Sequence, residues 1–116
     1  MILHLCGADE WRGEDYRAPS LDTVGFIHCS DPGTVAIPAN ALYRGRTDLV
    51  LLEIDPARLD VPLRWETGEP PHPEGVVFPH VYGRIPVEAV VAVHPFPPGP
   101  DGTFRLPASL AQRDPR

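Results

Sequence analysis

The sequence predicts a single small α+β domain with a curved, mostly antiparallel, split sheet and two or three short helices. The chain has 116 residues, a length at which one hydrophobic core is expected rather than two. Apolar residues make up 42% of it and charged residues 22%, which suits a folded chain with a core. It also contains 16 prolines and 10 glycines, which interrupt long helices and favour short elements joined by firm turns.

The first elements expected are a strand and a short helix. The apolar run at residues 2–6 predicts a buried opening strand. Asp9 is a suitable N-cap for a helix over residues 10–15, with Trp11 anchoring its apolar side.

A second strand and a longer helix are expected next. Residues 24–30 are rich in aromatic and β-branched side chains, which is typical of a strand. Asp31 followed by Pro32 predicts a helix start, and the helix should run to about Tyr43. Pro38 lies inside this span and should kink or interrupt the helix.

The clearest strand lies in the second half of the chain. Residues 48–55 are almost continuously apolar, as in a strand that is covered on both faces. The remaining segments expected there are a turn at 56–59, strands at 63–66, 78–82 and 89–94, and an exposed loop at 67–75.

Two regions are expected in the organisation of the chain. Residues 1–97 should form the domain, and residues 98–116 should form a tail rich in proline and glycine. Phe104 and Leu106 could dock on the domain, whereas residues 109–116 should be mobile.

The charge of the chain argues against general nucleic-acid binding. Ten basic residues, all of them arginine, face sixteen acidic ones, which gives a net charge of −6. Binding to a phosphate backbone relies on clustered cations, and the closest approach to a cluster is the pair Arg44 and Arg46. A single bound nucleotide remains compatible with this composition.

The sequence favours a cytoplasmic protein without a membrane partner. It contains no apolar stretch near the roughly 20 residues of a membrane span, and no basic-then-apolar start typical of a signal peptide. In a reducing compartment Cys6 and Cys29 are expected to be reduced, buried and apolar in character.

Four candidate metal ligands lie close together in two predicted strands: His4, Cys6, His28 and Cys29. Side chains alternate between the faces of a strand, so adjacent His28 and Cys29 should point to opposite faces. At most three ligands could then converge, whereas a structural zinc site takes four. We therefore predict no bound metal.

A cysteine nucleophile with a histidine base is an alternative reading of the same residues. Activation of a thiol requires a polar, partly exposed setting. Cys6 and Cys29 both lie in apolar runs, which favours a packing role.

The histidines are the stronger indication of a site. His4 and His28 lie in the middle of two strands that can pair, and we predict that both face one concavity. Such a pocket would bind a small planar molecule through ring stacking and hydrogen bonds, with an acid or base at hand. Its other candidate residues are Ser30, Trp65, Glu66, His80 and Tyr82. Core packing is the alternative role for Trp65 and Tyr82.

His28 should act as a neutral ring. Its neighbours on the same strand face, Phe26 and Ser30, provide no carboxylate, and burial without a charged partner disfavours imidazolium. Any acid–base step would then fall to Glu66 or His80.

Several segments of the chain follow the pattern of one known family. They are residues 2–4, Trp11, Tyr16 and residues 19–21, 25–30, 43–45, 48–55, 64–66 and 78–83. On these segments the sequence resembles the bacterial and plant family catalogued as domain of unknown function 952, over about residues 2–97. The loop at 67–75, the tail after residue 97 and Pro38 depart from that pattern.

This resemblance implies a distant similarity to the ADP-ribosyltransferase fold, whose members include RNA 2′-phosphotransferases that use NAD. By that similarity His4 would contact a ribose of NAD and His28 would stack on nicotinamide, with His80 or Tyr82 lining the pocket. Leu5 follows His4 where the group usually has glycine, and no arginine flanks His28, so RNA 2′-phosphate transfer is not expected.

Two functions therefore remain from the sequence. One is an ADP-ribosyltransferase-like enzyme that handles NAD or another nucleotide, with His4, His28 and Glu66 as its catalytic residues. The other is a non-catalytic module that binds a small ligand or a protein in the same cleft. The sequence assigns no certain cofactor and no oligomeric state.

Overall fold

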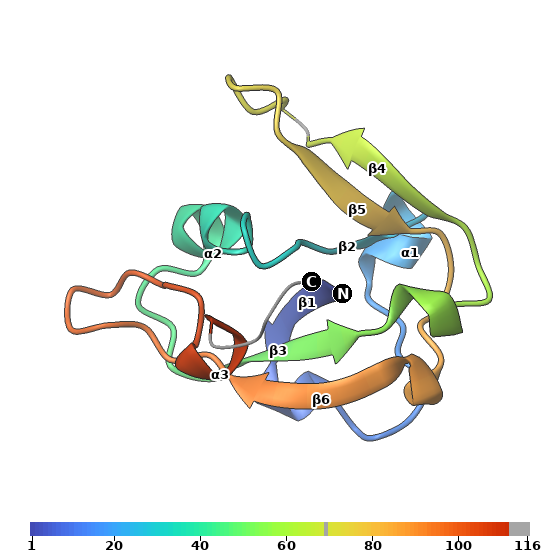
Figure 1. Ribbon diagram of the computed structural model, residues 1–116, viewed down its shortest axis with the longest axis horizontal. Helices are drawn as coiled ribbons and strands as arrows, with labels where there is room; N and C mark the ends of the chain where they lie inside the picture. Colours follow the sequence, from blue (N-terminus) through green and yellow to red (C-terminus); the bar gives the residue numbers. More distant parts are fainter. Residues whose placement is uncertain (69, 112–116) are drawn as a thin grey trace.

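The computed structural model describes residues 1–68 and 70–111. It consists of two antiparallel three-stranded sheets and a few short helices, so the predicted α+β class and split sheet are confirmed (Figure 1). The strand orders are β1-β3-β6 in the first sheet and β2-β5-β4 in the second. None of the described helices is long and apolar enough to cross a membrane.

The first sheet contains β1 (Ile2–Gly7), β3 (Leu49–Ile54) and β6 (Val90–Pro95). β3 is central, as its apolar sequence predicts, and both of its faces are covered. One face packs against the second sheet through residues such as Leu52. The other packs against α2 and the C-terminal segment through residues such as Leu51. The sheet is therefore the middle layer of the molecule.

The second sheet contains β2 (Ile27–His28), β4 (Leu63–Thr67) and β5 (Val77–Val81). β5 is central, and it pairs His80 with His28 on one side and with Arg64 on the other. The two sheets are joined at an isolated bridge between Leu3 and Ser30. This bridge brings β1 next to the chain segment that follows β2.

The helices are α1 (Ser20–Thr23), α2 (Ala36–Leu42) and α3 (Ala108–Ala111). Single 3₁₀ turns lie at Ala8–Glu10, Pro56–Arg58 and Val87–Ala89. The three short helices agree with the expectation from proline and glycine content.

Two predicted helices differ from those observed. In place of the helix expected at residues 10–15, the structure has the 3₁₀ turn at Ala8–Glu10. Gly13 takes a left-handed conformation with φ of 72°, which ends any helix there. The chain then extends to an isolated β-bridge between Tyr16 and Ile85. The helix expected from residue 31 begins only at Ala36, after turns. Pro38 then occupies the first turn, where a missing N–H costs no helical hydrogen bond, and it does not break the helix.

The strand expected at residues 24–30 is reduced to two paired residues, Ile27 and His28. Gly25 takes φ of 87° and so turns the chain just before Phe26, and the Ser20 hydroxyl donates to the Phe26 carbonyl at 2.7 Å. These local constraints remove the front of the predicted strand from the sheet.

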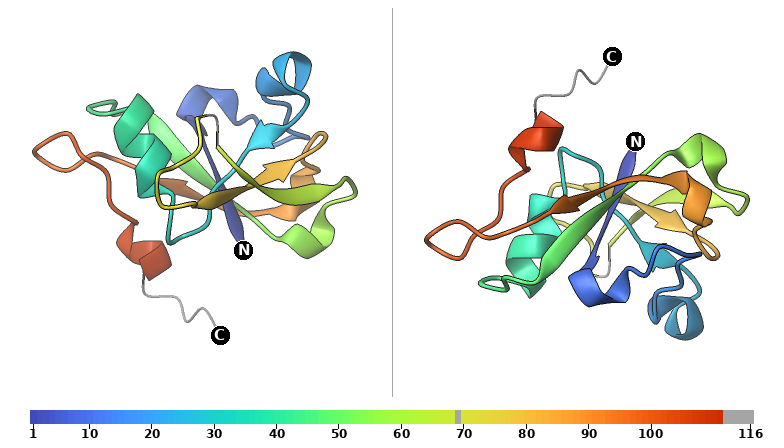
Figure 2. Two further views of the ribbon diagram at one scale, coloured as in Figure 1. Left: turned by 90° about the horizontal axis from the view of Figure 1, so that it is seen from above. Right: turned by 90° about the horizontal axis from the view of Figure 1, so that it is seen from below.

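The C-terminal segment packs on the outer face of the first sheet (Figure 2). Phe104 and Leu110 are buried there beside Phe96, and Leu106 packs partly against them. The docking expected for Phe104 is therefore observed. The mobility expected for residues 109–116 stays a prediction, and residues 112–116 lie outside the described part of the chain.

A substitution at Gly83 tests the packing between the residue that follows β5 closely and Val61, which lies in the segment before β4. A Cβ at Gly83 would lie 2.5 Å from Cγ1 and 2.9 Å from Cβ of Val61, a branched side chain with little room to move. Gly83→Ala should lower the free energy of unfolding by about 1–3 kcal/mol through this overlap. Urea denaturation measures the loss.

Gly33→Ala is the matched control, because its added methyl group would approach only the Asp31 carboxylate, at 3.4 Å. We expect that variant to stay within about 1 kcal/mol of the parent. Equal denaturation midpoints for the two variants would contradict the assigned contact with Val61.

Candidate functional site

A groove of about 780 Å³ lies on the side of the molecule where β1, β2 and α2 meet the loop after β4. This volume is in the range of small-molecule sites. Of the site residues predicted from the sequence, four line it: His4, His28, Ser30 and His80. His4 and His28 therefore share one concavity, which is the arrangement predicted for them.

His4 lies at the bottom of the groove and joins the two sheets. Its Nδ1–H donates to the backbone carbonyl of His28 at 2.7 Å, because a carbonyl oxygen can only accept. Its Nε2 then accepts from the hydroxyl of Tyr16 at 2.9 Å. Burial lowers the pKa of His4 from 6.5 to about 4, so the ring is neutral at pH 7 and both of its nitrogens are engaged.

His28 presents the more accessible ring. The residue is exposed overall, although Phe26 and His80 cover part of its ring, with centroids 4.9 and 5.6 Å away. Desolvation of this covered part lowers the pKa of His28, and the charge of His80 lowers it further. A neutral His28 can both donate and accept a hydrogen bond from a ligand.

His80 is held by a carboxylate and a phenyl ring. Its Nδ1–H donates to Oε1 of Glu66 at 2.8 Å, and Phe26 stacks on the imidazole with centroids 4.1 Å apart and planes at 16°. The Tyr82 hydroxyl donates to the same carboxylate oxygen at 2.6 Å. These contacts fix the orientation of the His80 ring, and Nε2 is the ring nitrogen that does not contact Glu66.

Glu66 is an ionised acceptor in this arrangement. Hydrogen bonds from Tyr82 and then from His80 hold the pKa of its carboxyl below the usual value. Neither Glu66 nor Tyr82 lines the groove itself. Both act through His80, and Glu66 is placed to orient that ring rather than to touch a ligand.

Trp65 does not line the groove, although the sequence predicts it among the site residues. It lies opposite Pro79 in the register of β4 and β5, so its side chain points to the face opposite that of Glu66. It is 48% exposed and does not line the groove. Core packing, the alternative role, is not observed either.

The two cysteines are poor nucleophiles in this structure. Burial is the main cause that raises the pKa of Cys6 to about 11, and burial also raises the pKa of Cys29. Both thiols are free. Within the described residues, no group of three histidine, cysteine or acidic side chains is arranged to hold a metal ion, and elemental analysis of the purified protein remains the test of the no-metal prediction.

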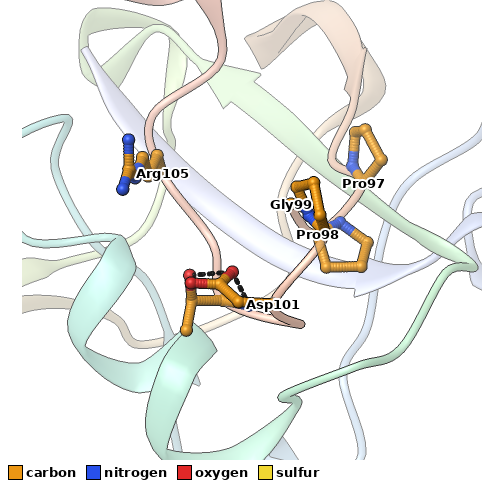
Figure 3. Close-up of a pocket in the computed structure, with 7 residues that line it drawn as sticks. Pro97, Pro98, Gly99, Asp101 and Arg105 are labelled. Carbon is orange, nitrogen blue, oxygen red and sulfur yellow. Dashed lines mark hydrogen bonds between the residues drawn. The ribbon is translucent and has the colours of Figure 1, made fainter.

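A second hollow of about 500 Å³ lies in the loop at residues 97–105 (Figure 3). Its carboxylate, Asp101, accepts hydrogen bonds from the backbone N–H and the hydroxyl of Thr103, at 3.0 and 2.6 Å. Three prolines and two glycines lie in this loop, and the hydrogen bonds of Asp101 to Thr103 stabilise its turn. The histidine groove is the better candidate for chemistry.

Two features of the structure were missed in the sequence. The sequence pattern marks Tyr16 only through the family resemblance, yet the Tyr16 hydroxyl is the group that fixes the His4 ring. Glu53 and His94 form a buried pair, with Oε1 and Nε2 at 2.8 Å, on the outer face of the first sheet. The sequence signal for this pair is Glu53 itself, because an acidic residue inside the apolar run of β3 needs a buried partner.

The fold and this groove define a small α+β protein with a candidate ligand site between its two sheets. The chain belongs to the family described as protein of unknown function DUF952, whose model matches residues 5–93. The expected family membership is therefore confirmed. A search of the curated proteins finds no match.

Solved structures of one bacterial protein share this fold. Two crystal structures of protein CC0527 from Caulobacter crescentus, one of them a double mutant, are 27% and 26% identical to this chain, each with a TM-score of 0.80. Both cover 95% of this chain and 97% of the other. A solution structure of the same protein is 27% identical with a TM-score of 0.72, and covers 97% of each chain. None of these matches supports the implied similarity to ADP-ribosyltransferases.

Proposed function

We propose that the protein binds a small molecule with a planar ring in the groove that contains His28 and His80. The convergence of these two rings on one cavity is the observation that carries the proposal. They lie opposite each other in neighbouring strands, and His28 keeps an exposed edge. Planar ligands stack on such rings and form hydrogen bonds with their nitrogens.

The rest of the groove suits a ligand of this kind. Tyr43 and Phe78 add aromatic surface, and Ile37 and Leu42 of α2 add aliphatic surface. Ile37 and Leu42 are 36% and 72% exposed, so α2 leaves apolar surface accessible beside the cavity.

Removal of the His28 ring tests the proposal. In a thermal-shift screen of nucleosides, nicotinamide, NAD and ADP-ribose, at least one compound should raise the melting temperature by a few degrees, because ligands that bind only the folded state stabilise it. His28→Ala should abolish this shift. His28→Gln should also lose binding but keep the stability of the parent.

Trp65→Ala is the matched control, because it removes an aromatic ring from the same sheet outside the groove. This variant should keep the full ligand-induced shift. If His28→Ala binds the screened compound as tightly as the parent does, His28 is a packing residue and the site is wrong.

A second candidate function is catalysis on the same ligand, and the contact between Glu66 and His80 favours it. A carboxylate that orients a histidine leaves the other ring nitrogen available as a general base. NAD is the substrate implied by the family resemblance. Incubation with NAD and chromatography of released nicotinamide would test it, with His80→Asn as the inactive variant and Trp65→Ala as the control.

A further inference from the structure

We infer that the groove selects uncharged ring-bearing molecules, of nucleobase or nucleoside size, over their anionic or phosphorylated counterparts. This inference rests on the proposed binding function and narrows it to a class of ligand. It therefore disfavours NAD, whose pyrophosphate is anionic, as the substrate of the second candidate function. The selectivity follows from the charged side chains that line the groove and from the hydrogen bonds that these side chains form within the protein.

Arg46 is the one arginine among the described lining residues, and its guanidinium is already engaged. Its Nε donates to Oδ1 of Asp48 at 2.9 Å, and its Nη2 donates to Oδ2 at 2.7 Å. The same group lies over the ring of Tyr43, 5.4 Å from its centroid. These two N–H groups are the pair of donors with which an arginine side chain would bind two oxygens of a phosphate.

The histidines that line the groove do not supply another positive charge for an anionic ligand. His4 is neutral and both of its nitrogens are bonded within the protein. The pKa of His28 is lowered, which disfavours its charged form at neutral pH. Nδ1 of His80 is bonded to the carboxylate of Glu66, and Nδ1 of His72 accepts a backbone hydrogen bond from Glu74.

One acidic side chain of the groove adds negative charge to it. Glu10 lines the groove near the end of β1, where its carboxylate accepts from the backbone N–H of Gly7 at 2.7 Å. That carboxylate therefore occupies a backbone donor that a phosphate oxygen could use. The whole chain carries a net charge of −6, which further opposes the approach of an anion.

Matched pairs of compounds test this selectivity, because each pair shares a ring and differs in charge. The pairs are nicotinamide with nicotinate, and each of the four common ribonucleosides with its 5′-monophosphate. Affinities measured at low ionic strength, where charge effects are largest, should favour the neutral member by about tenfold or more.

Asp48→Asn should relax this selectivity by releasing Arg46. In this variant we expect the affinity for the anionic member to rise about threefold or more, and that for the neutral member to stay unchanged. Asp60→Asn is the matched control, because Asp60 forms a similar two-point pair with Arg84 outside the groove. It removes the same charge and should leave both affinities unchanged.

The outcomes separate the inference from the proposed function. Anionic members that bind as tightly as neutral ones, or no gain in anion affinity in Asp48→Asn, would overturn the charge selectivity while ring binding stands. If no member of any pair binds and the wider screen also fails, the binding function itself is wrong.

Discussion

His94→Leu is expected to lower the free energy of unfolding by about 1.5–3 kcal/mol, the usual loss when a hydrogen bond to a buried acidic group is removed. Glu53 is 3% exposed and His94 is 7% exposed. Nε2 of His94 lies 2.8 Å from Oε1 of Glu53, and Nδ1 lies 2.9 Å from the hydroxyl of Ser109 in α3. Without the imidazole, a carboxylate is left inside the core without that donor.

A double-mutant cycle measured by urea denaturation checks this expectation. The double variant Glu53→Leu/His94→Leu should recover most of the loss, because both polar groups are then absent from the core. Ser109→Ala removes only one hydrogen bond and should cost about 1 kcal/mol. Additive losses in the double variant would contradict a direct pair between Glu53 and His94.

Acidification is expected to remove about 3 kcal/mol of stability through His4 alone. The pKa of this ring is about 4 in the folded protein against 6.5 for the ordinary group. The unfolded chain therefore binds more protons between these values, and the free energy of unfolding rises with pH across that window. The contribution is fully present above pH 6.5 and is lost as pH falls to about 4.

Denaturation midpoints measured across pH 4 to 7, compared with those of His4→Gln, check this contribution. The glutamine variant lacks the titrating ring, so its stability should fall less steeply with acid, although it is less stable at pH 7 because the bonds to Tyr16 and His28 are disturbed. Parallel pH curves for parent and variant would show that His4 is not the group responsible.

The sequence carries most of the information on the strands and less on the helices. Continuous apolar runs predicted β1 and β3 within one residue, because such runs need cover on both faces. The short β2 could not be predicted, since the turn at Gly25 and the hydrogen bond from Ser20 to the Phe26 carbonyl arise from contacts between neighbouring segments. α2 starts late for a similar reason, because turns after Asp31 precede it.

The candidate site was predicted in part. The pairing of His28 with His80 and the bridge at Ser30 brought the expected residues to one groove. Trp65 lies outside the groove lining, because strand alternation places it on the face opposite that of Glu66. The contact between Tyr16 and His4 joins segments whose spacing no local pattern specifies.

The hydrogen bond from His4 to the His28 carbonyl joins the two sheets, and this limits which fragments of the chain could keep the groove. The hairpin β4–β5 joins strands close in sequence, whereas β1 pairs with the distant β3, and the groove takes residues from both sheets. Local hairpins close at low entropic cost and distant pairings at a higher one. The groove is therefore a product of tertiary docking, and a fragment that keeps only one sheet would keep no binding surface to measure.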